Sequence, residues 1–227
     1  MFFFDPMYLV YALPGLIVAL WAQWAVQSTF ARYARVPTST GISGAEAARL
    51  MMQRTGLRVG LASTPGMLTD YYDPGEKTLN LSQSSTQNSV ASVAVVAHEF
   101  GHAMQDAQGY LPLKLRGAIV PAVQVGAWVG PLLFIAGVLF NLTGLAWAGL
   151  IAFAATAVFA IITLPVELNA SDRAMQLLAT NGILAGDELL GARKVLNAAA
   201  FTYVAALAQS LLTLLYYVSI LAGRRRD

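Results

Sequence analysis

The fold is decided by the 50 residues from Gly117 to Val166, which read GAIVPAVQVGAWVGPLLFIAGVLFNLTGLAWAGLIAFAATAVFAIITLPV and contain no charged side chain. A helix needs about 20 apolar residues to cross the hydrocarbon core of a bilayer. The stretch is therefore long enough for two crossings, and Asn141-Leu142-Thr143-Gly144 has the chemistry of a turn between them. A soluble helical core is a poor alternative, because so long an uncharged stretch offers no face to water. We expect a hairpin of two membrane helices, over residues 118–140 and 144–166.

Two further uncharged segments predict one membrane helix each. Neither Pro6–Ala31 nor Val195–Gly223 contains a charged residue, and we expect helices over 7–28 and 200–222. The first positive charge is Arg32, so the amino terminus lacks the basic start of a secretory signal peptide and is expected to remain as an anchor. Together with the hairpin, these segments predict a mainly α membrane protein with about four transmembrane helices.

The charged residues concentrate between the predicted membrane helices, in segments 32–116 and 167–199. Eight of the fourteen Lys and Arg residues lie in the first segment, and the turn at 141–144 has none. The positive-inside rule therefore predicts that both segments face the cytoplasm, in a multi-pass protein of the cell (inner) membrane. The formal net charge of only +2 argues against a nucleic-acid partner, and the absence of cysteine excludes disulfides and thiolate metal ligands.

Segment 32–116 has the pattern of a small α+β domain. A capping box at Ser43-Gly44-Ala45-Glu46 predicts a helix over 44–55. Leu57–Ser63 is expected to be a strand. Met67–Tyr72 and Lys77–Ser82 flank an Asp-Pro-Gly-Glu sequence with turn chemistry, so they are expected to form a short β-hairpin. A helix from about Gln87 to Gln108 completes the segment, and residues 167–199 are predicted to be helical too.

Both histidines of the chain lie in one string, His98-Glu99-Phe100-Gly101-His102, on the last helix of segment 32–116. Positions i and i+4 of a helix lie on the same face, so two imidazoles placed there can bind one metal ion together. Burying these polar groups on an otherwise apolar helix is unfavourable unless they have a partner. The string therefore predicts a zinc site with Glu99 as the general base.

The third zinc ligand must come from elsewhere in the chain, because a catalytic zinc ion usually has three protein ligands and one water molecule. No other His and no Cys exists, so a carboxylate is expected unless a backbone group, a tyrosine or a second water replaces it. The acidic residues without an evident other role are Asp70, Glu167 and Asp172. Glu167 is favoured, because an acid at the end of a membrane helix is unfavourable without a role and the hairpin returns it to the side of the histidines. The alternative is a boundary charge paired with Arg173.

Several stretches spread over nearly the whole chain resemble a known family. They are Phe4-Asp5-Pro6, Arg32 to Val36, Leu68 to Pro74, His98 to Gln105 and Leu164 to Ser171. The chain is similar to the YugP-type membrane zinc metallopeptidases and, more distantly, to the HtpX and Ste24 peptidases, whose third zinc ligand is a glutamate. The resemblance implies a zincin-like domain of the gluzincin type, with one zinc ion per chain on His98, His102 and Glu167. It also implies that Glu99 is the base.

One departure from the distant relatives concerns the residues behind the ligands. The HtpX pattern is E-x-x-A-D, and its aspartate supports a zinc-bound histidine. Here Ser171 holds that place and Asp172 follows one residue late. Metal-bound histidines almost always have such a partner, and Asp172, Asn169 and Asp70 are the candidates.

The predicted function is that of a membrane zinc endopeptidase acting on polypeptides close to the bilayer or on membrane proteins. Tyr71, Tyr72 and Arg173 are candidate donors to the oxyanion of the reaction. Strand Lys77–Ser82 could bind substrate as an added strand, and the alternative is an ordinary strand of the hairpin. Assembly with a second copy or with other membrane proteins stays open.

Two other functions compete with this prediction. A site-2-type intramembrane zinc protease has its H-E-x-x-H inside a spanning helix, but the run before His98 is polar and too short to span. A non-enzymatic metal-binding membrane scaffold has no use for a free base such as Glu99, since structural zinc sites are normally closed by four ligands.

Overall fold

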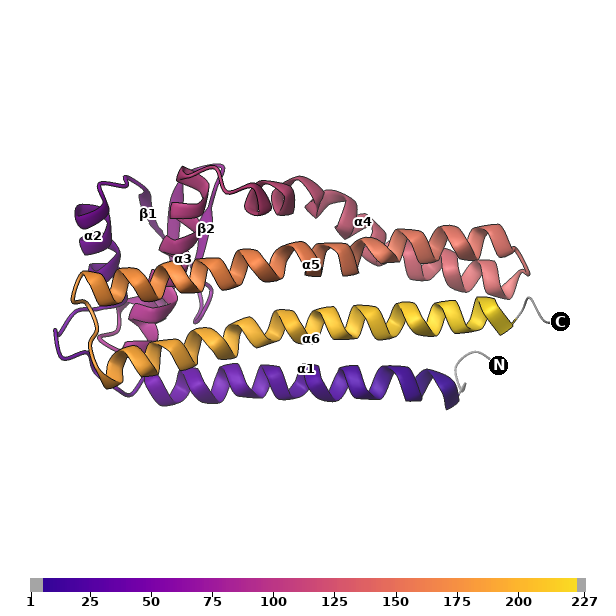
Figure 1. Ribbon diagram of the computed structural model, residues 1–227, viewed down its shortest axis with the longest axis horizontal. Helices are drawn as coiled ribbons and strands as arrows, with labels where there is room; N and C mark the ends of the chain where they lie inside the picture. Colours follow the sequence, from indigo (N-terminus) through magenta and orange to yellow (C-terminus); the bar gives the residue numbers. More distant parts are fainter. Residues whose placement is uncertain (1–5, 224–227) are drawn as a thin grey trace. The chain divides into compact units, whose positions relative to one another are not determined.

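The computed structural model describes residues 6–223, which are mostly helical (Figure 1). In chain order its elements are α1 (Pro6–Tyr33), α2 (Gly44–Thr55), β1 (Gly60–Ser63), β2 (Tyr71–Asp73), β3 (Thr78–Leu81), the 3-10 helix η2 (Gln83–Thr86), α3 (Val90–Ala107), α4 (Leu111–Leu139), α5 (Thr143–Thr180) and α6 (Asp187–Gly223). The quoted Phe4-Asp5 lies outside the described residues. The prediction of a helical membrane protein with a small α+β part is confirmed.

Four of the described helices are long and apolar enough to cross a membrane, namely α1, α4, α5 and α6. The turn between α4 and α5 falls at the predicted place, with Asn141 in the left-handed conformation at φ 57°. Both α5 and α6 are much longer than a bilayer requires, at 38 and 37 residues. Residues 167–180 therefore continue the helix that contains the third predicted span, and residues 187–199 begin the helix of the fourth.

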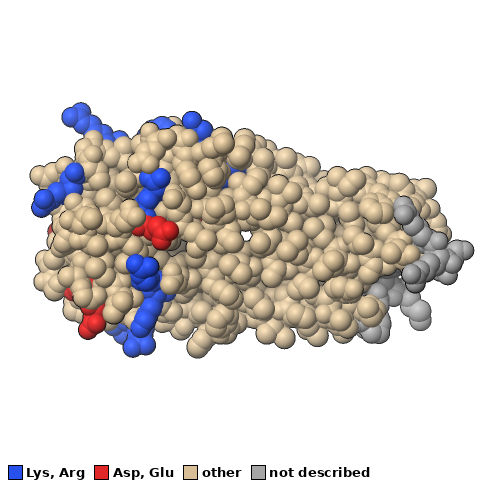
Figure 2. Space-filling model, in the orientation of Figure 1, with Lys and Arg blue, Asp and Glu red and all other residues tan. Residues whose placement is uncertain are grey.

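The chain divides into two compact units. The first unit comprises Met1–Gln23, Leu115–Leu164 and Thr202–Asp227, and the second comprises Trp24–Lys114 and Pro165–Phe201. Among the described residues of the first unit only Arg116 is charged. In Figure 2 the Lys, Arg, Asp and Glu side chains gather over elements of the second unit. The second unit also contains every residue proposed above for the zinc site.

Small residues and aromatic rings hold the first unit together. A methyl group added to Gly126, Gly130 or Gly137 of α4 would meet the backbone of α5, so these glycines let the two helices approach closely. Phe134 and Tyr217 stack with ring centroids 3.9 Å apart. Helix packing in a bilayer depends on such close contacts, because lipid provides no hydrophobic driving force between helices.

In the second unit, α2 and α3 pack against each other and a three-stranded sheet lies beside α3 (Figure 1). The capping box at the start of α2 is confirmed: Ser43 Oγ accepts a hydrogen bond from Glu46 N at 3.3 Å, and Glu46 Oε2 accepts one from Ser43 N at 2.7 Å. The buried core includes Met51, Leu79 and Phe100 together with Leu178 of α5. Helix α5 is thus part of the core that positions α3.

The predicted β-hairpin is present, because β2 pairs antiparallel with β3. The prediction that strand Lys77–Ser82 accepts a substrate strand is wrong. β1 pairs parallel with the other edge of β3, so the strand order is β1-β3-β2 and β3 is the central strand. A central strand has both edges occupied, and only β1 and β2 have an edge outside the pairings of this sheet.

Candidate metal centre

The two histidines lie on one face of α3, as the i, i+4 spacing predicts. Their ring centroids are 4.7 Å apart and the ring planes are nearly perpendicular. His102 is buried, with 8% of its surface exposed, and His98 is partly buried. The helix begins at Val90, where the N-cap residue Ser89 accepts a hydrogen bond from Ser92 N. Its apolar core-facing residues fix the direction in which both imidazoles point.

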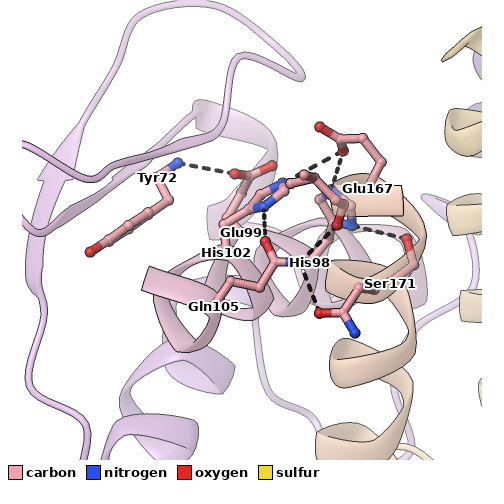
Figure 3. Close-up of polar contacts among 9 residues, drawn as sticks. Tyr72, His98, Glu99, His102, Gln105, Glu167 and Ser171 are labelled. Carbon is pink, nitrogen blue, oxygen red and sulfur yellow. Dashed lines mark hydrogen bonds and ion pairs between the residues drawn. The ribbon is translucent and has the colours of Figure 1, made fainter. Parts of the chain in front are cut away.

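Glu167 of α5 meets both histidines. Its Oε2 atom lies 3.0 Å from His98 Nε2 and 3.5 Å from His102 Nε2, and only 3% of its surface is exposed (Figure 3). Ligand atoms bound tetrahedrally at about 2.0 Å from a zinc ion are roughly 3.3 Å apart. The two separations from Glu167 Oε2 are close to that value, and two imidazoles and a carboxylate form a donor set that zinc prefers. The residues present therefore fit a zinc ion.

Glycine at position 101 makes this meeting of α3 and α5 possible. A methyl group added to Gly101 would collide with the backbone carbonyl of Ala170. Helix α5 can thus lie directly against the H-E-x-x-H turn, and Glu167, one turn before Ala170, reaches the histidines. The glycine inside the string has a packing role that is visible only in three dimensions.

Glu99 occupies a different part of the site from Glu167. Its Oε2 accepts a hydrogen bond from the backbone N–H of Tyr72 at 3.0 Å. Ligand atoms of His98, Glu99 and His102 all lie within 4.8 Å of one another. Burial raises the pKa of the Glu99 carboxyl above its ordinary value. The carboxylate is thus close to the histidines but is held from the side of β2.

Two acidic groups act on the imidazole of His102. Burial alone would lower its pKa, but the hydrogen bond to Glu167 and the negative charge of Glu99 outweigh burial, so the pKa of His102 is raised. A pair of carboxylates around two imidazoles attracts positive charge. The electrostatics of the pocket therefore favour a bound cation, in agreement with the donor set.

The comparisons with known proteins agree with this geometry. A family described as "putative neutral zinc metallopeptidase" matches residues 8–222. The chain belongs to this family. It is 40% identical over 223 residues to the protein named "putative membrane protease YugP" of Bacillus subtilis, a match that covers 97% of this chain and 99% of that protein. No solved structure matches the chain.

The contacts of the two histidines are with neutral side chains that the sequence did not single out. His98 Nδ1 lies 3.1 Å from Ser171 Oγ, and His102 Nδ1 lies 2.9 Å from Gln105 Oε1 (Figure 3). Ser171 occupies the place of the aspartate in the HtpX pattern, which is the sequence signal that could have identified it. Gln105 follows His102 by three residues, a spacing at which helical side chains are neighbours.

The three predicted partners lie elsewhere. Asn169 contacts Gln105 instead of a histidine: its Oδ1 accepts a hydrogen bond from Gln105 Nε2 at 3.0 Å. Asp70 accepts hydrogen bonds from the backbone and hydroxyl of Ser82, at 2.8 and 2.6 Å, and anchors the loop before β2. Asp172 is exposed and lines a cavity of about 370 Å³ between α5 and α6.

The side chains of the three candidate oxyanion donors are either exposed or bonded elsewhere. Tyr71 is 48% exposed. The ring of Tyr72 is directed away from Glu99 in Figure 3, and its hydroxyl donates to Asp106 Oδ2 at 2.8 Å. Arg173 donates to Asn169 Oδ1 at 2.7 Å and to Gln108 Oε1 at 2.6 Å. Of these residues, it is the backbone N–H of Tyr72 that reaches the site.

Proposed function

We propose that this metallopeptidase is a membrane-bound zinc endopeptidase in which His98, His102 and Glu167 hold one zinc ion and Glu99 is the general base. The observation that carries the proposal is the approach of both imidazole Nε2 atoms to one carboxylate oxygen of Glu167, at 3.0 and 3.5 Å. Family membership supports the metal and the class of reaction.

The two glutamates are assigned different roles from their contacts. Glu167 is the ligand in this proposal, because its Oε2 lies close to both Nε2 atoms. Glu99 is the base, because it lies beside the ligands while its Oε2 is bound by Tyr72 N. A carboxylate beside the metal that is not needed as a ligand is free to accept and release a proton.

Zinc held at this site would polarise a peptide carbonyl and lower the pKa of a bound water molecule toward about 7. The remaining chemistry belongs to the chain. Glu99 takes a proton from the attacking water and later delivers it to the leaving amine. The backbone N–H of Tyr72 donates to Glu99 Oε2 and is proposed to hold the carboxylate of the base in place.

The substrate is proposed to be an extended polypeptide near the membrane, bound along β2 instead of β3. β2 pairs with β3 on one side only, and its Tyr72 N–H reaches Glu99. A polypeptide added at this edge would satisfy its backbone hydrogen bonds regardless of sequence. It would also bring a peptide bond to the base, which suits an enzyme acting on unfolded segments or tails of membrane proteins.

The site is proposed to face the cytoplasm from the cell membrane. The segments that contain it carry most of the Lys and Arg residues, as the positive-inside rule requires. In sealed vesicles with the cytoplasmic face outward, added trypsin should cleave within residues 32–116. Cleavage there only in vesicles of the opposite orientation would reverse the topology.

The structure disfavours the site-2-type alternative. The H-E-x-x-H string lies on α3, an 18-residue helix that is not among the spanning helices found in residues 6–223. An intramembrane protease of that type requires these residues at membrane depth.

The activity test uses the full-length protein in detergent and an unfolded, fluorescently labelled polypeptide. Wild type loaded with zinc should cleave it, a chelator should stop cleavage, and Glu99→Gln should be inactive. Glu76→Gln, the same substitution at an exposed turn residue, is the matched control and should be fully active. Cleavage by Glu99→Gln at the wild-type rate would refute the role of Glu99. Zinc binding without cleavage by the wild type would favour the scaffold alternative.

A further inference from the structure

A chain of hydrogen bonds extends from Arg173 through Asn169 and Gln105 to His102. Arg173 Nε donates to Asn169 Oδ1 at 2.7 Å, Gln105 Nε2 donates to the same oxygen at 3.0 Å, and Gln105 Oε1 lies 2.9 Å from His102 Nδ1. Gln105 has no exposed surface. A fully buried amide is unfavourable unless its hydrogen bonds are made. Here they connect a histidine of one helix to a second helix, and such a network makes the site rigid.

In this series of hydrogen bonds, which group donates and which accepts is determined by Arg173 and by the backbone carbonyl of Val166. A guanidinium has only donors, so Asn169 must turn its oxygen toward Arg173. Gln105 Nε2 also lies 2.8 Å from the backbone carbonyl of Val166, which can only accept. The amide nitrogen of Gln105 therefore faces α5, and its oxygen faces His102. His102 must then donate from Nδ1.

The consequence for a neutral imidazole is a single tautomer. With the proton on Nδ1, Nε2 has a lone pair available to a metal ion bound between it and Glu167 Oε2, which lies 3.5 Å away. Without a metal, the carboxylate of Glu167 opposes this tautomer by attracting a proton to Nε2. The contact of His98 has no such direction, because the hydroxyl of Ser171 can donate or accept. The two histidines are therefore controlled differently, although both partners are neutral.

Gln105 acts on the third ligand as well. Val166, whose carbonyl accepts from Gln105, is the residue before Glu167 on α5. One side chain thus bonds both to His102 and to the backbone next to Glu167 (Figure 3). Loss of the amide would remove the acceptor that keeps a proton on His102 Nδ1, and it would also remove a hydrogen bond between α3 and α5.

We propose that Gln105, directed by Arg173, Asn169 and the Val166 carbonyl, is a positioning residue that holds His102 in the Nδ1–H tautomer and ties it to the turn of Glu167. The proposal rests on the assignment of His102 and Glu167 as zinc ligands. The tautomer itself is a property of the metal-free protein and can be measured independently of that assignment.

The experiment combines histidine NMR with zinc affinity. The chain has only two histidines, so untagged full-length protein labelled with 15N-histidine gives signals from two rings alone. In metal-free wild type, one ring should keep its proton on Nδ1 over the whole pH range in which the protein stays folded, because Gln105 Oε1 accepts from that nitrogen. His98→Ala removes the other ring from the spectrum and assigns the signal to His102.

Three variants that remove different parts of the network should change the tautomer of His102 and the Kd for zinc to different extents. Gln105→Leu should shift the ring toward the Nε2–H form that free histidine prefers and raise the Kd for zinc by roughly 10- to 100-fold. Asn169→Ala removes one of the two acceptors of Gln105 and should act in the same direction, but less. Gln108→Leu is the matched control, since Gln108 is exposed, lies three residues further on, and its side chain bonds to Arg173 on the solvent side of the network. It should leave tautomer and Kd unchanged.

A wild-type tautomer and zinc Kd in folded Gln105→Leu would overturn the proposal, as would an Nε2–H tautomer in the wild type. If Gln105→Leu does not fold, Asn169→Ala decides by the same readouts. One further result would contradict the proposed function and leave the role of Gln105 intact. If the wild type shows the expected tautomer but binds zinc no better than His98→Ala, the network stands and the zinc assignment falls.

Discussion

Gly101 of α3 faces the backbone carbonyl of Ala170 on α5 with no room for a methyl group between them. Substitution by alanine must therefore push the two helices apart. We expect Gly101→Ala to destabilise the fold by about 1–3 kcal/mol, as overpacking typically does, and to lose zinc because Glu167 moves away from the histidines. Thermal unfolding and zinc content in detergent measure both. Gly117→Ala, where nothing lies within 4 Å of the added methyl, is the control and should keep both properties. Full zinc content in Gly101→Ala would show that the close approach is not required.

Ser171 is the partner of His98 Nδ1, at 3.1 Å. Removing its hydroxyl leaves that nitrogen without the contact, so Ser171→Ala should weaken zinc binding on the order of tenfold. Competition with a chromophoric chelator gives the Kd. Ser171→Thr keeps a hydroxyl and should bind zinc more tightly than Ser171→Ala. Equal affinity in wild type and Ser171→Ala would remove Ser171 from the description of the site.

Tyr72 links the β-hairpin to α3 through its hydroxyl bond to Asp106, which also pairs with Lys77. Tyr72→Phe keeps the buried ring but loses a hydrogen bond to a charged group, which is worth roughly 1.5–3 kcal/mol. The melting temperature should fall by about 2–4 °C for each kcal/mol in a chain of this size. Tyr71→Phe, at the neighbouring exposed position, should change it little. A similar loss in both variants would mean that the Asp106 contact is not the cause.

The same contact predicts a dependence of stability on pH. Burial alone would raise the pKa of Asp106, but the hydrogen bonds from Lys77 and Tyr72 dominate and lower it below its ordinary value of 3.8. A carboxyl with a lowered pKa in the folded state stabilises the fold fully above its unfolded pKa, and this contribution is lost as the pH falls through the folded pKa. Wild type should thus exceed Asp106→Asn in melting temperature at neutral pH, and the difference should shrink below about pH 4. A difference that grows with acidity would contradict the shift.

The sequence predicted those features that depend on local chemistry or on length. Uncharged stretches long enough for a bilayer located the four spanning helices, and the Ser43 capping box located α2. The H-E-x-x-H spacing placed two imidazoles on one face of α3. Each of these follows from a rule that needs no knowledge of distant residues.

Features created by the packing of distant segments were not predictable in the same way. The parallel pairing of β1 with β3 depends on a partner that is not the next strand in the chain, and it made β3 central. Gln105 has no acidic charge to mark it as a histidine partner, and its role appears only when α5 lies beside α3. Tyr72 contributes a backbone N–H, which every residue except proline has, so the residue type does not indicate this role.

Of the two glutamates beside the histidines, we propose that Glu167 is a zinc ligand and Glu99 is the base. The most direct measurement is the zinc content of purified wild type, Glu99→Gln and Glu167→Gln by mass spectrometry, after dialysis against metal-free buffer. We expect about one zinc ion per chain in wild type and Glu99→Gln and almost none in Glu167→Gln. Full zinc content in Glu167→Gln together with loss of zinc in Glu99→Gln would contradict it.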